Sequence, residues 1–233
     1  MNIFQIIKED FLNVKKNDPA LESPFELFFN YPGLWAMFFY RIAHYIHIKK
    51  IKILPRLIAS IAQLITNIDI HPASTIGRRV FIDHGSGVVI GATTIIGNDV
   101  IIYQQVTLGG VSTSKGKRHP TIEDNVVIGT GAKILGNITI GQNSKIGANS
   151  VVVKNIPKNS TATGIPARIL SRKPNNNKLN HNELPDINKE IFEYLLHRIE
   201  ILENSIKTHD TNHIDEEDQK LLKTYNEYID SMK

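Results

Sequence analysis

An aliphatic side chain recurs at every sixth position through the middle of the chain. The unit often continues with glycine, and its fifth position is small or β-branched. Neither the helical period of 3.6 residues nor the alternation of an ordinary strand produces a period of six. The repeated aliphatic positions are Ile70, Ile76 and Ile82, then Ile90, Ile96, Ile102 and Leu108, and then Ile122, Ile128, Ile134, Ile140, Ile146 and Val152.

A six-residue period is typical of a β-solenoid with three flat walls, because three units close one triangular coil. Each aliphatic side chain then points inward and stacks on the equivalent side chain about 18 residues away. Ordinary strands of a sandwich do not require such a regular period. The pattern therefore predicts a mainly β protein with a parallel β-helix over residues 69–170.

The repeat is interrupted twice. Ile90 lies eight positions after Ile82 instead of six, so two extra residues fall around Asp83-His84. Ile122 lies fourteen positions after Leu108, and the surplus falls in a polar stretch from Gly110 to His119. Loops that project from a rigid scaffold often carry binding and catalytic groups, so we expect the functional residues at these two interruptions.

The flanks of the repeat predict helices. Residues 1–68 form an expected α-helical N-terminal domain, in which Asp18 precedes a proline suited to a first helical position. The apolar stretch from Leu54 to Ile68 is interrupted by polar residues and is too short to span a membrane. After Gly164 and Pro166, which we expect to release the chain from the coil, residues 171–233 predict a polar linker and two amphipathic helices, a C-terminal helical hairpin.

The composition excludes several kinds of functional site and partner. The chain has 233 residues and no cysteine, which excludes disulfides, thiolate zinc sites and a cysteine nucleophile. A net charge of +4 is too small and too dispersed to indicate a nucleic-acid partner. With no signal peptide or membrane span in the sequence, the expected location is cytoplasmic.

Three short segments carry candidate chemistry: Asp69-Ile-His71, Asp83-His84 and Arg118-His119. The first two are slightly less than one coil apart, so we expect them on neighbouring rungs about 4.8 Å apart at one corner. A histidine paired with a carboxylate can act as a general base, and a guanidinium can bind a substrate carboxylate. The third segment must fold back to this corner or reach it from an adjoining subunit.

Two other interpretations remain open at this point. His84 can be an ordinary surface residue at a corner and Arg118 a solvated loop charge. Alternatively, His71, His84 and His119 can converge between subunits on zinc, although the sequence has no compact ligand pair such as HxxxH. The charged residues beside the histidines suit an organic zwitterion better than a metal ion.

Residues 18–170 resemble bacterial serine O-acetyltransferases, which are hexapeptide-repeat acyltransferases. This resemblance implies a left-handed parallel β-helix and the transfer of acetyl from acetyl-CoA to the hydroxyl of L-serine, giving O-acetylserine for cysteine biosynthesis. The hexapeptide repeat specifies only the superfamily, whereas the three charged motifs select this member. The matching segments are Asp69-Ile-His-Pro-Ala-Ser-Thr-Ile-Gly77, Asp83-His-Gly-Ser-Gly-Val-Val-Ile-Gly91, Val106-Thr-Leu-Gly-Gly110, Arg118-His-Pro120, Gly131-Ala-Lys-Ile-Leu-Gly-Asn137 and Gly164-Ile-Pro-Ala-Arg168.

The resemblance also implies roles for single residues. His84 is the implied general base, and Asp69 is its orienting partner. Acetyl-CoA is the implied co-substrate, bound in a groove between neighbouring solenoids of a homotrimer, and no metal is expected. The implied serine contacts are Asp18, Asp83, Arg118 and His119, and the implied coenzyme contacts are Gly110, Thr130, Lys145 and Ala148. Thr130 departs from the small residue that is usual in the family.

Two departures from the family limit the expected partners. The helical region before Asp69 is shorter than in hexameric members, which favours a trimer. Members that dock into cysteine synthase end in isoleucine, whereas this sequence ends in Lys233, so that complex is not expected.

The alternatives to a serine acetyltransferase are an acetyltransferase for another hydroxyl or amine such as a sugar, a metal-dependent hydratase, and a non-catalytic scaffold. The absence of cysteine favours direct attack of the acceptor on the thioester.

Overall fold

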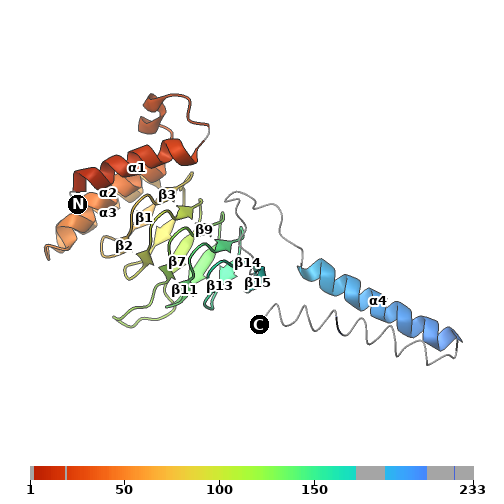
Figure 1. The fold of residues 1–233 in the computed structure, drawn as a ribbon. Helices are drawn as coiled ribbons and strands as arrows, with labels where there is room; N and C mark the ends of the chain where they lie inside the picture. The colour runs from red at the N-terminus through yellow and green to blue at the C-terminus, as the bar shows by residue number, and fades with distance from the viewer. Residues whose placement is uncertain (1–2, 19, 172–186, 209–222, 224–233) are drawn as a thin grey trace. The chain divides into compact units, whose positions relative to one another are not determined.

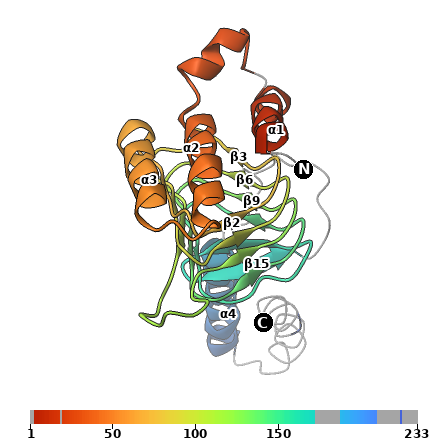
Figure 2. The ribbon, with the colours of Figure 1, turned by 90° about the vertical axis from the view of Figure 1, so that its left-hand side faces the viewer.

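The computed structural model describes residues 3–18, 20–171, 187–208 and 223. The chain divides into two compact units, Met1–His181 and Asn182–Lys233, which are considered separately here. In the first unit, helices lie at one end of a stack of short strands (Figures 1 and 2). The period of six therefore produces the predicted parallel β-helix, preceded by a helical region.

The strands form three walls, which we call A, B and C. All neighbouring strands within them are parallel, except for the last pair of wall C. Wall A contains β1 (Asp69–Ile70), β4 (Val89–Ile90), β7 (Thr107–Gly109), β10 (Lys133–Leu135) and β13 (Val151–Val152). Wall B contains β2 (Thr75–Ile76), β5 (Ile95–Ile96), β8 (Thr121–Ile122) and β11 (Thr139–Ile140). Wall C contains β3 (Phe81–Ile82), β6 (Ile101–Ile102), β9 (Val127–Ile128), β12 (Lys145–Ile146), β14 (Thr161–Gly164) and β15 (Ala167–Ser171).

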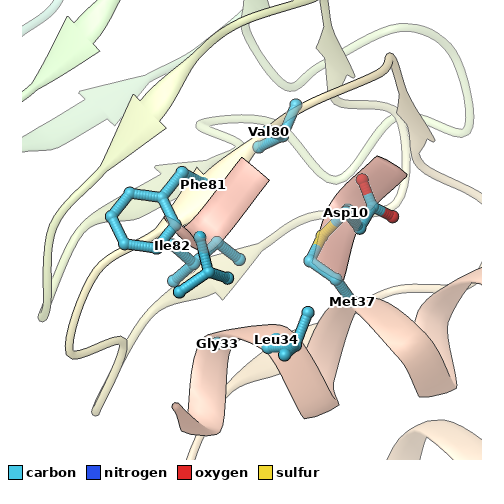
Figure 3. A pocket seen from close by; sticks show the side chains of 8 residues that line it. Asp10, Gly33, Leu34, Met37, Val80, Phe81 and Ile82 are labelled. Carbon is cyan, nitrogen blue, oxygen red and sulfur yellow. The ribbon is translucent and has the colours of Figure 1, made fainter. Parts of the chain in front are cut away.

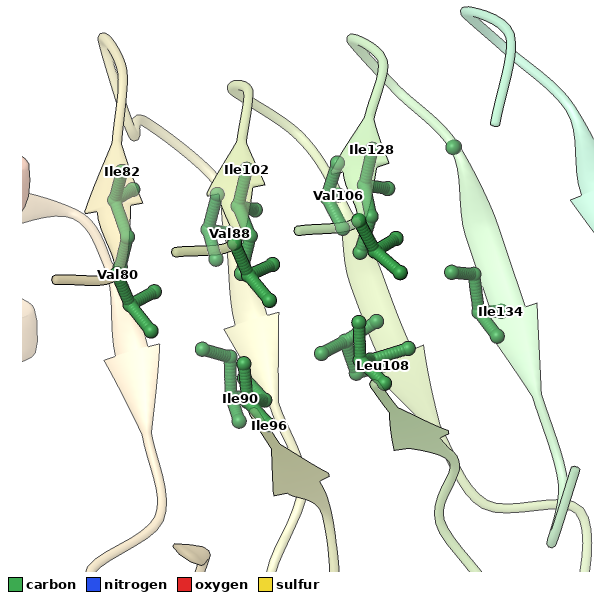
Figure 4. Close-up of a cluster of buried hydrophobic side chains, with 14 of the residues drawn as sticks. Val80, Ile82, Val88, Ile90, Ile96, Ile102, Val106, Leu108, Ile128 and Ile134 are labelled. Carbon is green, nitrogen blue, oxygen red and sulfur yellow. The ribbon is translucent and has the colours of Figure 1, made fainter. Parts of the chain in front are cut away.

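The repeated aliphatic residues fill the interior of the solenoid (Figure 4). Ile102, Ile128 and Ile134 are fully buried, and Ile90 stands in register with both Ile70 and Leu108 on wall A. Outside the two interruptions the fifth positions also point inward, and Ala132 there is fully buried. Ser86, the fifth position after Ile82, is exposed, and Val88 is buried in its place. Small side chains are needed at these positions because the interior is close-packed and leaves little space between three walls.

Both interruptions of the repeat fall in turns and leave the wall register intact. We call the edges AB, BC and CA after the walls that they join. The residues between Ile82 and Val89 make a wide turn at edge CA, where His84 and Gly85 have φ of 56° and 71°. Glycine is required at position 85 because a Cβ would come within 2.4 Å of the Ile68 side chain. The longer insertion leaves the coil between β7 and β8, at edge AB (Figure 1).

The helical region contains α1 (Ile3–Asn17), the 3-10 helix η1 (Pro24–Phe28), α2 (Pro32–His47) and α3 (Ile53–Thr66). The expectation that Asp18 starts a helix at the following proline was wrong. Its Oδ1 accepts a hydrogen bond of 2.8 Å from the backbone N–H of Ala20 and so closes a local turn. The next helical turn begins at Pro24, where Ser23 provides the cap.

A buried ion pair joins the helices to the first coil. Arg41 of α2 contacts Asp10 of α1, with Nε and Oδ2 3.0 Å apart, and also donates to the carbonyls of Ile76 and Gly77. The hydroxyl of Tyr40 donates to a further carbonyl of this coil, that of Ser74. The helices therefore satisfy backbone groups that the end of a solenoid would otherwise leave unpaired.

A small, largely apolar pocket also lies where the helices meet wall C (Figure 3). Its polar lining comes from Asp10, which is already paired with Arg41. We interpret it as a packing seam and not as a substrate site. The lining residues are Asp10, Val14, Gly33, Leu34, Met37, Val80, Phe81 and Ile82.

The parallel winding of the solenoid ends at Gly164 and Pro166, as expected. The chain then turns back, and β15 pairs with β14 as an antiparallel hairpin on wall C. In the second unit, α4 (Ile187–Thr208) confirms the first predicted amphipathic helix. Most of the predicted linker and nearly all of the second predicted helix lie outside the described residues, so the C-terminal hairpin stays a prediction. Within the described ranges, no helix has the length and apolarity needed to cross a membrane.

Candidate active site

Edge CA carries an acidic cluster around His84. Asp83 is half-buried and His84 is exposed in the wide turn after β3. Asp18, at the end of α1, is close enough for its charge to act on Asp83. The hydroxyl of Tyr31 donates a 2.7 Å hydrogen bond to Asp18 Oδ2, which fixes this carboxylate from the start of α2. The structure thus brings Asp18, Asp83 and His84 together.

The electrostatics of this cluster favour a cationic partner. Burial raises the pKa of Asp83, the charge of Asp18 raises it further, and His84 opposes the shift. Burial raises the pKa of Tyr31, the hydrogen bond and charge of Asp18 raise it further, and Glu26 and Asp83 contribute less. Burial, and then the charge of Asp83, raise the pKa of Tyr103. Two carboxylates flanked by two neutral phenols can bind a substrate ammonium group.

Asp69 begins wall A beside the same edge. Its backbone N–H donates to the carbonyl of Val88 at 2.9 Å, and its side chain points outward because Ile70 points inward. Among the described residues, no hydrogen bond joins the side chains of Asp69 and His84. The structure therefore places them at one edge, as expected, while their direct pairing stays a prediction.

Edge AB carries the other two predicted serine contacts. His119 is 7% exposed, and its ring lies against Gly91, where a Cβ would come within 2.0 Å of the ring. Arg118 Nη1 donates to the carbonyl of Ser112 at 3.0 Å. The pKa of His119 is lowered by burial and then by the charges of Arg118 and Lys117. The long loop therefore folds back onto edge AB, and its surroundings disfavour the protonated form of the histidine.

Wall A separates these two edges within one chain. His84 precedes β4 and Gly91 follows it, so the two groups lie at opposite ends of one strand. Arg118 and His119 contact the far end, and the loop does not return to His84. The expected convergence of the three charged motifs therefore does not occur inside one copy of the chain.

Three of the four predicted coenzyme contacts lie on these two edges, and the fourth lies on wall C. Thr130 and Ala148 lie in turns of edge CA, two and three coils beyond the turn that holds His84. Successive turns are joined by backbone hydrogen bonds, such as the 2.7 Å bond from Asn149 to Thr130. Gly110 lies on edge AB, where an added Cβ would come within 3.2 Å of the Arg118 side chain. Lys145 lies on wall C, and burial lowers its pKa.

A zinc site built from the three histidines does not form inside one copy of the chain. Within the described part of the molecule, no three His, Cys, Asp or Glu side chains are grouped so that they could hold a metal ion. His71 Nδ1 accepts a hydrogen bond of 3.0 Å from the backbone of Ala73. His119 Nδ1 is likewise bonded, to Thr93. The alternative of a zinc site between subunits stays untested.

Sequence reasoning did not identify several residues of these edges. Tyr31 and Tyr103 carried no motif, and Gly91 and Thr93 were part of the repeat. Tyr31 stands next to Pro32 at a helix start, which marks a boundary and not a site. Their proximity to the charged residues comes from the fold, and no local sequence signal indicates it.

Comparisons with known proteins agree on one family. Residues 119–154 match the family model described as bacterial transferase hexapeptide (six repeats). A serine acetyltransferase from Bacillus subtilis (strain 168) is 52% identical over 185 residues, covering 78% of this chain and 85% of the relative. One from Synechococcus elongatus is 43% identical over 206 residues, covering 88% of this chain and 84% of the relative.

Solved structures give the same result. A serine acetyltransferase from Neisseria gonorrhoeae in complex with serine has a TM-score of 0.69 at 37% identity, covering 72% of this chain and 69% of the other. A serine acetyltransferase in complex with CoA has a TM-score of 0.68 at 43% identity, covering 72% and 70%. These neighbours and the hexapeptide match imply the left-handed coil that the sequence predicted.

Proposed function

The chain belongs to the serine acetyltransferase family, an acetyl-CoA-dependent group of O-acyltransferases, and we propose how its residues move an acetyl group to the hydroxyl of L-serine. The product, O-acetyl-L-serine, is a precursor for cysteine biosynthesis. The observation that supports our assignment of roles is the placement of Asp18, Asp83 and His84 on the edge that also carries Thr130 and Ala148.

The acceptor hydroxyl needs a base, and His84 is our candidate. Its imidazole takes the hydroxyl proton while the oxygen attacks the thioester carbonyl. Asp69 orients the ring and stabilises the imidazolium that forms. When the tetrahedral intermediate collapses, the carbon–sulfur bond breaks and the thiolate of CoA accepts the proton from His84. Backbone N–H groups near Gly110 are our candidates for stabilising the oxyanion.

The two charges of the amino acid need partners of opposite sign. Asp83 and Asp18 form the acidic cluster that we assign to the serine ammonium group. Arg118 offers a planar guanidinium for the serine carboxylate, and His119 lies beside it in the sequence. A neutral sugar has no ionic groups for these residues, so their charge pattern favours an amino acid as acceptor.

A neighbouring copy has to complete the site. Wall A separates His84 from Arg118 within the chain, so we propose that edge CA of one subunit meets edge AB of the next. A heterologous contact of this kind closes into a ring, and three copies form the homotrimer that we propose. The coenzyme then lies in the groove between the edges, with Thr130, Lys145 and Ala148 on one side and Gly110 on the other.

The experiment is a CoA-release assay on the purified chain with a panel of acceptors. We expect release with acetyl-CoA and L-serine, and little release with sugars, D-serine or amines that lack a carboxylate. Rapid mixing with acetyl-CoA alone is the blank, and a burst of free CoA there would indicate an acyl-enzyme instead of direct attack. Preferential acetylation of a sugar would overturn the assignment of serine as the acceptor.

A further inference from the structure

Thr93 is hydrogen-bonded to each residue of the Lys117–His119 segment. It lies in the turn after β4, and its hydroxyl oxygen accepts the backbone N–H groups of Arg118 at 3.0 Å and His119 at 3.1 Å. The same oxygen is 2.8 Å from His119 Nδ1. The Thr93 carbonyl accepts a 2.7 Å hydrogen bond from Lys117 Nζ. One residue of the scaffold therefore holds the end of the long loop.

These contacts determine where the proton on His119 resides. A threonine hydroxyl has one proton and two acceptor lone pairs. Since both lone pairs accept backbone N–H groups, the remaining O–H of Thr93 points to Nδ1 of His119 as a donor. The backbone N–H of Thr93 also donates to Nδ1, at 3.2 Å. Nδ1 is therefore an acceptor without a proton, and the neutral ring carries its proton on Nε2.

The surroundings keep the ring in this state. Burial and the cations Arg118 and Lys117 lower the pKa of His119, which disfavours a second proton. The ring lies over two glycines, because a Cβ at Gly91 would come within 2.2 Å of Nε2 and one at Gly110 within 3.3 Å. No described residue forms a hydrogen bond with Nε2. The Nε2–H is therefore the polar group of the ring that remains available to bind a ligand.

We propose that Thr93 is a positioning residue that fixes His119 as its neutral Nε2–H tautomer, so that His119 donates a hydrogen bond to the carboxylate of the acceptor. This inference rests on the proposed function for the identity of the ligand, but the tautomer itself does not depend on it. His119 then acts with Arg118 on one carboxylate, and it does not compete with His84 for the role of base.

The first test observes the tautomer directly. Full-length protein labelled with ¹⁵N-histidine is studied by long-range ¹H–¹⁵N NMR, and the His119 ring is assigned by its disappearance in His119→Gln. We expect a protonated Nε2 and an unprotonated Nδ1 near neutral pH in the absence of substrate. A ring protonated at Nδ1, or at both nitrogens, would overturn the proposal whatever the activity of the enzyme.

The second test separates positioning from simple loop support. Thr93→Val keeps the shape and removes the hydroxyl, whereas Thr93→Ser keeps the hydroxyl. In Thr93→Val only the longer 3.2 Å bond from the backbone N–H still holds Nδ1 as an acceptor, so we expect a larger share of the other tautomer. We also expect KM for serine to rise by about 10- to 100-fold, the equivalent of one lost hydrogen bond to a charged group. KM for acetyl-CoA should change much less. Thr93→Ser should restore both the NMR signature and KM.

A matched pair of variants tests the donor itself. The amide of His119→Gln can donate near the position of Nε2, whereas that of His119→Asn is placed nearer to Nδ1. We expect the glutamine variant to bind serine more tightly than the asparagine variant. Equal KM values for the pair, or an unchanged serine KM in Thr93→Val, would overturn the donor role. Wild-type protein with the expected tautomer but no transfer to serine would instead contradict the proposed function alone.

Discussion

The hydroxyl of Tyr31 lies 2.7 Å from the carboxylate of Asp18, and this pair stands next to Asp83 at the edge of the solenoid. The contact joins the end of α1 to the start of α2 and fixes one anion beside another. After burial, the charge of Asp18 is the second cause that raises the pKa of Asp83. A cationic ligand beside the two carboxylates would counter this repulsion.

Removal of the charge on Asp18 should lower the pKa of Asp83. Asp18→Asn keeps an oxygen for Tyr31 but removes the like charge, which is the second cause of the upward shift after burial. Carboxyl ¹³C NMR titration measures the change, and Glu22→Gln at an exposed position serves as the control. An unaltered pKa of Asp83 would show that burial alone accounts for the shift.

Asp83→Asn should stabilise the protein at neutral pH. A raised pKa means that the folded state binds the proton more tightly than the unfolded state, so the ionised carboxylate opposes folding above its folded pKa. The gain in free energy of unfolding should be present at pH 7. It should disappear below about pH 3.9, where the carboxylate is protonated in both states. Urea titrations across this pH range measure the free energy of unfolding of both proteins. A less stable Asp83→Asn variant at pH 7 would contradict the prediction.

His84→Ala should lower kcat by about 10²- to 10⁴-fold, the usual loss on removal of a general base. The matched control is Asn143→Ala, because Asn143 is also exposed, has φ of 60° against 56° for His84, and lies on edge BC. Both variants place alanine in left-handed backbone, so they share that conformational cost. Equal kcat values for the two variants would remove His84 from the mechanism.

A mixture of two inactive variants should recover activity if the site lies between subunits. Co-expression of His84→Ala and Arg118→Ala chains gives mixed rings in which some interfaces join an intact His84 edge to an intact Arg118 edge. An interface is intact when its His84 edge comes from an Arg118→Ala chain and its Arg118 edge from a His84→Ala chain. In random assembly of equal amounts, this holds for about one quarter of the interfaces. The kcat/KM for serine of the mixed and the separate preparations provides the measurement. No recovery in confirmed mixed oligomers would place both groups in one subunit.

Arg41→Met should destabilise the first unit by about 3–5 kcal/mol, because it leaves Asp10 as a buried charge without its partner. It also removes the donor to two carbonyls of the first coil. Urea unfolding measures the loss, and a second change, Asp10→Leu, should recover part of it. Glu9→Gln breaks the exposed pair with Arg78 and should have a much smaller effect. Similar losses at both pairs would contradict the role of burial.

The sequence predicted the solenoid well because the period of six is a local rule. Inward positions such as Ile102 and Ile134 were identified from their spacing alone and are fully buried. The two interruptions were also predicted, because the spacing between aliphatic positions exceeds six only there. The start of a helix after Asp18 was predicted wrongly, because a single carboxylate can close a local turn as readily as it caps a helix.

The positions of the site residues relative to one another could not be predicted in this way. Asp18 comes near Asp83 because the outward side chains of wall C, such as Phe81 and Ile101, pack against Val14 and Leu34 of the helices. His119 comes to Gly91 because Thr93 binds the end of the loop. Neither contact follows from a period or a motif.

The sequence by itself determined the coil, its core and the chemical groups on its edges, because inward and outward directions follow from residue spacing. Only the tertiary structure decided which groups share an edge and which lie apart. Those distances depend on long-range packing of helices and loop against the walls. For this reason His84 and Arg118, which motif reasoning placed in one site, lie at opposite ends of wall A in a single chain.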